Sequence, residues 1–202
     1  MTLEIFENVY EPAEDSYMLA EHAKKLKGKI LDMGTGCGIV ALTNAKHNPK
    51  NFVEGCDINE SAVRNAEHNA RVNGIRNVRF FVSDMFNAVP KNKKYNWIVF
   101  NPPYLPTEKN EKIKGKLNYA FDGGRSGRKI LDRFLKECRM HLENNGGVML
   151  ISSSLSGHEK TIGMLKRMGF EVEILEEKKF FFERLYAVRA KLKEQYKRYR
   201  SL

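Results

Sequence analysis

A glycine-rich turn at residues 34–38 limits the choice of fold more than any other feature of this sequence. An apolar segment at 29–33 precedes the turn, and a pattern typical of a helix follows it at 39–47. Glycines between a strand and a helix let the backbone approach a ligand closely, although a tight structural turn would use them equally well. Glycine occupies every second position of the turn: Gly34, Gly36 and Gly38.

Strands and helices are predicted to alternate along the rest of the chain. Such alternation favours an α/β fold with a mostly parallel sheet that helices cover on both faces. One long irregular stretch remains, at 105–127, and loops of that length in compact domains are usually functional or mobile. Apolar periodicity predicts helices at 12–26, 39–47, 59–72, 128–142 and 157–168, and strands at 29–33, 52–56, 78–82, 95–100, 147–152, 171–175 and 185–189.

Two helix starts can be predicted from capping residues. Asn59 is expected to cap the helix at 59–72. Gly123 and Gly124 are compatible with a turn before the helix at 128–142, with Ser126 as its cap. Each helix carries apolar residues at helical spacing, which predicts one buried face. The expected buried residues are Val63, Ala66 and Ala70 in the first helix, and Ile130, Leu131, Phe134, Leu135, Cys138 and Leu142 in the second.

Three aspartates, Asp32, Asp57 and Asp84, lie at the carboxyl ends of the first three predicted strands. In open α/β sheets these ends meet at the crevice where ligands bind. A carboxylate after the second strand can accept both ribose hydroxyls of an adenosine, and one after the third can accept from an adenine amino group. Each aspartate alone is equally compatible with an ordinary loop or cap, but the three in register favour an adenosine site. The glycine turn holds no lysine, which excludes a phosphate-binding P-loop.

The fourth predicted strand runs into the tetrapeptide Asn101-Pro102-Pro103-Tyr104. Its prolines stiffen the chain, leaving the Pro102 carbonyl and the Asn101 side-chain oxygen as acceptors. Two neighbouring acceptors suit an NH2 group, and Tyr104 offers a flat face for a planar amide or base. The lone pair of such a nitrogen is delocalised, so acceptors that orient it toward an electrophile would promote attack. The alternative is a structural Pro-Pro turn.

The length and composition fit a single globular domain over residues 1–202. No apolar run reaches the roughly 18 residues that a membrane span needs. The N-terminus shows no signal-peptide pattern, so a cytoplasmic protein is expected. Three scattered cysteines predict neither a disulfide framework nor a metal site.

The net charge of +10 is concentrated toward the C-terminus, where a basic tail is predicted at about 190–202. A basic tail can hold RNA, a ribosome or an acidic partner by sequence-independent attraction. It is equally compatible with a solvated helix end.

The glycine turn and the three aspartates resemble motifs of the class I methyltransferases that use S-adenosylmethionine (AdoMet). The resemblance implies a Rossmann-like fold with a mostly parallel seven-stranded sheet and AdoMet as the cofactor. It places the methionine part of AdoMet beside Asp32, Gly34 and Gly36. The ribose is then assigned to Asp57, and the adenine to Asp84 and Met85.

Residues 9–17 and 121–134 resemble two signatures of the HemK-type glutamine methyltransferases, and the likeness spans about 9–188. Only about ten residues precede the first signature, which points to the archaeal and eukaryotic branch rather than to bacterial members with an extra N-terminal domain. By this resemblance Ser16 and Asn101 contact AdoMet. The substrate would lie against Asn101, Pro102, Pro103, Tyr104, Gly123 and Gly124.

This family methylates the side-chain amide of the glutamine in the Gly-Gly-Gln loop of class 1 translation release factors. Its archaeal and eukaryotic branch often works with a small zinc-binding activator subunit. The resemblance therefore implies a release factor as substrate, and an activator is expected at the edge of the strand at 78–82. Apolar residues on both faces of that strand would suit such pairing, or a cover of the chain's own helices.

Three other functions stay open from the sequence. An RNA or DNA exocyclic-amino methyltransferase is favoured by the basic tail, although no target-recognition domain or base-flipping insert is evident. A protein lysine methyltransferase would not need the Asn-Pro-Pro-Tyr tetrapeptide, because a deprotonated lysine has an accessible lone pair. A non-enzymatic AdoMet-binding protein would be expected to lack Asn101 or the glycines, and all of these are present.

Overall fold

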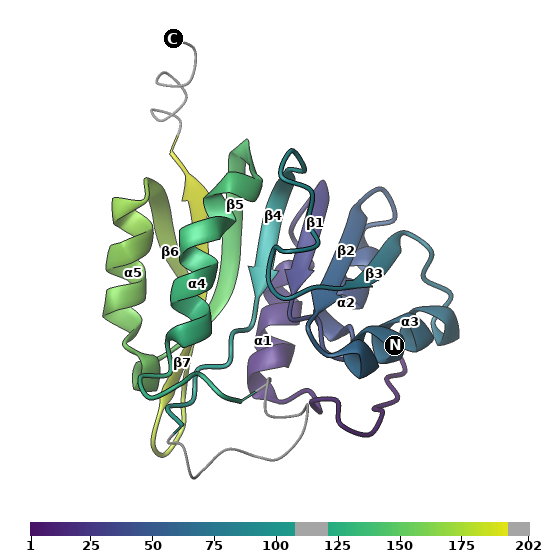
Figure 1. The fold of residues 1–202 in the computed structure, drawn as a ribbon, viewed down its shortest axis with the longest axis horizontal. Coiled ribbons are helices and arrows are strands. Elements are labelled where there is room, and N and C mark those ends of the chain that lie inside the picture. Colours follow the sequence, from purple (N-terminus) through teal and green to yellow (C-terminus); the bar gives the residue numbers. More distant parts are fainter. Residues whose placement is uncertain (108–120, 194–202) are drawn as a thin grey trace.

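The computed structural model describes residues 1–107 and 121–193, whose seven strands form one sheet in the order β3-β2-β1-β4-β5-β7-β6 (Figure 1). Strands β1 to β5 pair in parallel, whereas β7 runs antiparallel to both β5 and β6. This arrangement confirms the predicted mostly parallel, seven-stranded sheet. The strands are β1 Lys29–Met33, β2 Phe52–Asp57, β3 Val78–Val82, β4 Tyr95–Phe100, β5 Leu142–Ser153, β6 Phe170–Lys179 and β7 Arg184–Leu192.

Helices cover both faces of the sheet, as predicted. Successive side chains of a strand point to opposite faces, so each strand feeds two hydrophobic clusters. Ile30 and Val99 pack in the cluster that includes α1 (Glu14–Ala23), α2 (Ile39–His47) and α3 (Glu60–Val72). Their neighbours Leu31 and Ile98 pack in the cluster that includes α4 (Lys129–Glu137) and α5 (His158–Arg167). Across residues 1–107 and 121–193, no helix has the length and apolar character to span a membrane.

The start of α4 differs from the prediction. Ser126 does not cap the helix, because Gly127, which lies between Ser126 and α4, turns the chain in a left-handed conformation (φ +67°). Arg128 occupies the cap position, and its buried guanidinium donates to the Ser156 and Gly157 carbonyl oxygens at 2.7 and 3.1 Å. In contrast, Asn59 caps α3 as predicted, since its side chain accepts from the Ser61 N–H.

The end of α4 also differs, because the predicted helix at 128–142 stops at Glu137. A short 3-10 helix, η2 (Cys138–His141), follows it, and Leu142 already pairs with Tyr95 as the first residue of β5. The predicted stripe is otherwise buried, except that Ile130 is only partly covered.

The C-terminal hairpin is longer than the predicted strands at 171–175 and 185–189, because β6 reaches Lys179 and β7 reaches Leu192. Residues 190–192, predicted as the start of the basic tail, therefore belong to a strand. Both strands of the hairpin carry many charged residues, so a pattern of apolar residues does not reveal their full length. Arg184 of β7 pairs with Glu177 of β6, and Arg189 pairs with Glu173. Residues 194–202 of the predicted tail and 108–120 of the predicted irregular stretch lie outside the described residues.

Asparagines of α3 hold the N-terminal segment, residues 2–8, against that helix. Side chains at four-residue spacing on the helix meet backbone groups at two-residue spacing on the extended segment. The backbone N–H groups of Phe6, Glu4 and Thr2 donate to Oδ1 of Asn65, Asn69 and Asn73 at 3.0, 3.0 and 2.9 Å. We call this set the asparagine ladder. Because Asn59 also donates to the Asn8 carbonyl oxygen at 2.8 Å, the segment is guided toward the carboxyl ends of the strands.

Candidate functional site

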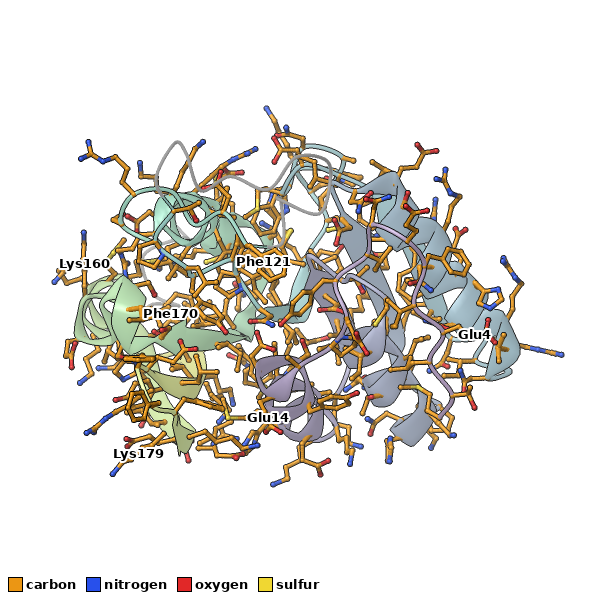
Figure 2. All side chains as sticks on the ribbon, turned by 90° about the horizontal axis from the view of Figure 1, so that it is seen from below. Glu4, Glu14, Phe121, Lys160, Phe170 and Lys179 are labelled. Atoms are coloured by element: carbon orange, nitrogen blue, oxygen red, sulfur yellow. The ribbon has the colours of Figure 1, made fainter. Side chains whose placement is uncertain are left out.

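A cavity of about 270 Å³ opens at the carboxyl ends of β1 to β4. Figure 2 looks onto this end of the molecule, with Phe121 near the middle and Glu14 below it. The fold brings most of the predicted site residues into one wall, although Gly123 and Gly124 are not part of it. The wall includes Ser16, Asp32, Gly34, Gly36, Asp57, Asp84, Met85, Asn101, Pro102, Pro103 and Tyr104.

The glycine turn is held open by Asp57 at the end of β2. One carboxylate oxygen of Asp57 accepts from the Gly36 N–H at 3.0 Å, and the other accepts from the Asn59 N–H at 2.8 Å. Gly36 adopts a left-handed conformation (φ +56°), and a Cβ atom added to it would meet no atom within 4 Å. Since Gly36 lines the cavity, a side chain there would occupy space that the glycine leaves for a ligand.

Asp32 is a buried carboxyl group at the base of the cavity, with 2% of its surface exposed. One of its oxygens accepts from the Thr35 hydroxyl at 2.7 Å and from the Ala41 N–H at 3.1 Å. Burial raises the pKa of Asp32 to about 7, and the nearby Asp57 acts in the same direction, although both hydrogen bonds oppose the change. A cationic ligand in the cavity would favour its ionised form.

Asp84 and Met85 form the wall beyond β3. Both Asp84 carboxylate oxygens accept from one Arg133 nitrogen, at 2.7 and 2.9 Å, a contact that the sequence did not indicate. Met85 is buried and left-handed (φ +51°), which is a strained conformation for a residue with a side chain. The Ser83 hydroxyl donates to the Met85 carbonyl oxygen at 2.7 Å and supports this conformation. The role of this wall beside an adenine stays a prediction.

Asn101 presents an unpaired acceptor at the site. Its Nδ2 donates to Oδ2 of Asp15 at 3.0 Å and lies 3.4 Å from the Ser16 hydroxyl. A carboxylate only accepts, so the amide nitrogen must face Asp15 and the oxygen must face the other way. That oxygen, Oδ1, is buried and has no hydrogen-bond partner within the described part of the chain. An unpaired buried acceptor costs about 1–3 kcal/mol, which an N–H donor from a ligand would offset.

Asp15 is the residue that the sequence reading missed. It is 4% exposed and accepts from the Tyr10 and Tyr104 hydroxyls at 3.3 and 3.2 Å, in addition to Asn101. Burial and the charge of Asp15 raise the pKa of both tyrosines, which therefore stay protonated as donors. The only signal in the sequence was the place of Asp15 beside Ser16 in the first signature. Its partner Asn101 lies 86 residues further along the chain.

Gly123 and Gly124 support the site from outside the cavity. The Gly123 N–H donates to the Leu105 carbonyl oxygen at 3.2 Å, and the Thr107 N–H donates to the Gly124 carbonyl oxygen at 3.1 Å. A Cβ atom on Gly127 would lie 2.3 Å from the Tyr104 carbonyl oxygen, so this turn packs directly behind the tetrapeptide. A contact of these glycines with substrate stays a prediction.

Comparison with known proteins gives a consistent result. The model of the methyltransferase small domain family matches residues 13–182. A Methanocaldococcus jannaschii protein provisionally named as a protein N5-glutamine methyltransferase is 46% identical over 93% of this chain and 94% of its own length. A release factor glutamine methyltransferase of Thermodesulfovibrio yellowstonii is 36% identical over 60% of this chain and 45% of its own length, so the chain spans less than half of that relative.

A solved structure of another protein shares the fold of this chain. The structure of the E. cuniculi Mtq2–Trm112 complex, described as responsible for methylation of the eRF1 translation termination factor, aligns with a TM-score of 0.67. The alignment covers 92% of this chain and 99% of that one, at 24% sequence identity. At that identity the likeness shows that the fold is shared.

Proposed function

The chain belongs to the methyltransferase small domain family, and from that premise we propose that it methylates the side-chain amide of a glutamine in a translation release factor, with AdoMet as donor. The names of its relatives confirm the resemblance to HemK-type glutamine methyltransferases that the signature segments indicated. The observation that carries the proposal is the buried, unpaired Oδ1 of Asn101 in the wall of the cavity.

The residues that line the cavity suit the charge of AdoMet and leave space for it. AdoMet supplies an electrophilic methyl group on a positively charged sulfur, and it also carries an amino group. Space beside Gly36, where a Cβ would meet nothing, can take the ligand, and the buried carboxyl of Asp32 suits its cationic part. Asp57, next to the turn, is the candidate for holding the ribose hydroxyls.

The Asn-Pro-Pro-Tyr segment supplies what a weak nucleophile needs. A glutamine amide offers two N–H donors, and the segment offers Oδ1 of Asn101 and the Pro102 carbonyl oxygen. Neither oxygen is used in a hydrogen bond between described residues. Two fixed acceptors would orient the nitrogen and stabilise the positive charge that develops on it. Tyr104, held by Asp15, can lie against the flat amide.

Labelled AdoMet can test the proposal directly. The chain is incubated separately with a class 1 release factor, with the same factor carrying Gln→Ala in its Gly-Gly-Gln loop, and with transfer or ribosomal RNA. Label is expected on the unaltered factor alone. Label on RNA would favour the exocyclic-amino alternative, and label on the Gln→Ala factor would indicate another residue, such as a lysine.

AdoMet binding is expected to strengthen as the pH rises from about 5.5 to 8. The free protein holds a proton on Asp32 up to about pH 7, and a cationic ligand requires the carboxylate. Each pH unit below that pKa should therefore weaken binding by up to about tenfold, with little change above it. Burial also raises the pKa of Asp57, which acts in the same direction. Calorimetric titration over this range checks the slope, and a flat profile would contradict it.

The same group has an opposite effect on the stability of the free protein. The pKa of Asp32 is higher in the folded state than its ordinary value of 3.8, so between about pH 4 and 7 the folded state binds more protons than the unfolded state. Free energy of unfolding contributed by Asp32 is therefore lost as the pH rises through this window.

An activator subunit is proposed at the free edge of β3. This strand ends the sheet, and among the described strands it pairs only with β2. Its Phe80 is buried under the chain's own residues, whereas Val82 is 47% exposed. We also propose that the reaction takes place in the cytoplasm, because the proposed substrate is a translation factor. We further propose that the basic tail contacts RNA or a ribosome through its positive charge.

A further inference from the structure

The turn between β6 and β7, residues 180–183, exposes three consecutive aromatic side chains. Phe180 is 41% exposed, Phe181 92% and Phe182 82%. The rings of Phe181 and Phe182 meet edge to face, with centroids 4.5 Å apart. Turns favour Gly, Asn, Asp, Pro and Ser for conformational reasons, and side chains this exposed add little to a core. Neither turn formation nor stability therefore explains these phenylalanines. We call residues 180–183 the phenylalanine turn.

Figure 1 shows the turn between β6 and β7 at the lower end of the sheet, where β1 and β4 also end. The last residue of this turn, Glu183, lines the cavity and accepts from the Ser153 hydroxyl at 3.0 Å. Lys178, just before the turn, pairs with Glu14 of α1 at 2.6 Å, next to the site residue Asp15. These contacts from two elements hold the turn in place relative to the unpaired acceptor of Asn101.

Other exposed apolar side chains gather at the same end of the sheet. Ile58 follows β2, Leu105 follows β4 and Leu155 follows β5, and they are between 37% and 41% exposed. Ile58 and Leu105 also line the cavity. Exposed apolar side chains around a pocket are typical of interaction sites, and large aromatic residues contribute strongly to protein–protein affinity. Exposed apolar side chains therefore border the candidate acceptor site.

We propose that Phe180, Phe181 and Phe182 dock the protein substrate by covering an apolar patch on the release factor beside its methyl-acceptor glutamine. The inference rests on the proposed function, and it names the surface that selects the substrate. A cavity that receives one planar amide gives little affinity for a macromolecule, so the surface around its mouth must supply the rest. Continuity with the cavity wall through Glu183 favours the substrate over a lipid surface or a second copy of the chain.

The double substitution Phe181→Ser and Phe182→Ser in the full chain tests the docking surface. Serine suits a turn, and both side chains lie outside the core, so folding should be unaffected. We expect KM and Kd for the intact release factor to rise at least about tenfold, because buried aromatic contacts are lost. AdoMet affinity, kcat at saturation and turnover of a short Gly-Gly-Gln peptide should stay unchanged, since none of them involves the turn.

The matched control is Met140→Ser, which alters another exposed apolar side chain (53%) just before the opposite end of β5 and should leave KM unchanged. Unchanged KM and Kd in the double variant, with the wild type labelling the factor, would overturn the docking surface alone. Loss of AdoMet affinity in the double variant would also overturn it. The same holds if the wild type self-associates or binds vesicles and the double variant loses that property while KM stays unchanged. A wild type that labels no release factor would remove the proposed function and the docking surface together.

Discussion

Asn101→Ala is expected to lower kcat about 10²- to 10³-fold while AdoMet still binds with nearly unchanged affinity. The substitution removes the unpaired Oδ1, the one buried side-chain acceptor in the cavity wall that lacks a partner within the described residues. Loss of a single preorganised partner of a developing charge typically has an effect of this size. Steady-state kinetics with labelled AdoMet and a release factor give kcat, and calorimetry gives the cofactor affinity.

A matched control for Asn101→Ala is Asn87→Ala, an exposed asparagine outside the cavity wall. It should turn over like the wild type. Asn101→Asp gives a second comparison, because it keeps the oxygens but sets a carboxylate against Asp15, which lies 3.0 Å from the present amide nitrogen. Like charges at that distance would displace the side chain, so this variant should also be slow. Normal turnover of Asn101→Ala would remove Asn101 from the mechanism.

Asp15→Asn is expected to lower kcat roughly a hundredfold, although Asp15 need not touch either ligand. The carboxylate fixes the Asn101 amide, because it can only accept from Nδ2. An asparagine at 15 can donate, so the Asn101 amide could turn and present its NH2 group to the substrate in place of its oxygen. The substrate would then meet a donor where it needs an acceptor, and the charge-assisted hydrogen bonds to Tyr104 and Asn101 would be weakened.

Asp15 acts through Asn101, so its test needs a readout that general destabilisation would not give. AdoMet affinity and the melting temperature should change little in Asp15→Asn while kcat falls and KM for the release factor stays within a few-fold. Glu21→Gln, at an exposed position on α1 outside the cavity wall, is the control and should stay near wild-type activity. Tyr104→Phe, which removes one donor to Asp15, should have a smaller effect. Full activity of Asp15→Asn would contradict the positioning role.

The sequence predicted the first half of the fold closely because its strands are short, apolar and bounded by strong signals. The strands at 29–33, 78–82 and 95–100 have the predicted bounds, since both faces of a central parallel strand are buried or a clear turn follows. The C-terminal hairpin was underestimated because its alternating charged residues pair across the strands. Arg184 and Glu177, for example, pair across strand positions that lie outside the predicted strands.

The site was predictable at residues whose type and local position are enough to indicate their role. The glycines and Asp57 follow strand ends, and such residues point to the ligand crevice from local pattern alone. Asp15 and Arg133 were not predictable in this way, because their roles depend on partners far along the chain. Arg133 pairs with Asp84 across 49 residues, and no local pattern shows that the two will meet.

The asparagine ladder joins a helix and an extended segment whose repeat distances differ slightly. Four residues of a helix rise about 6.0 Å, whereas two residues of an extended chain advance about 6.7 Å, so the two scales drift by about 0.7 Å at each rung. They can agree over only a few rungs, as they do at Asn65, Asn69 and Asn73, and a slipped alignment would lose most of the matches. Only one alignment of the first residues with the helix therefore satisfies all three hydrogen bonds. This alignment fixes where Asn8 and Tyr10 line the cavity.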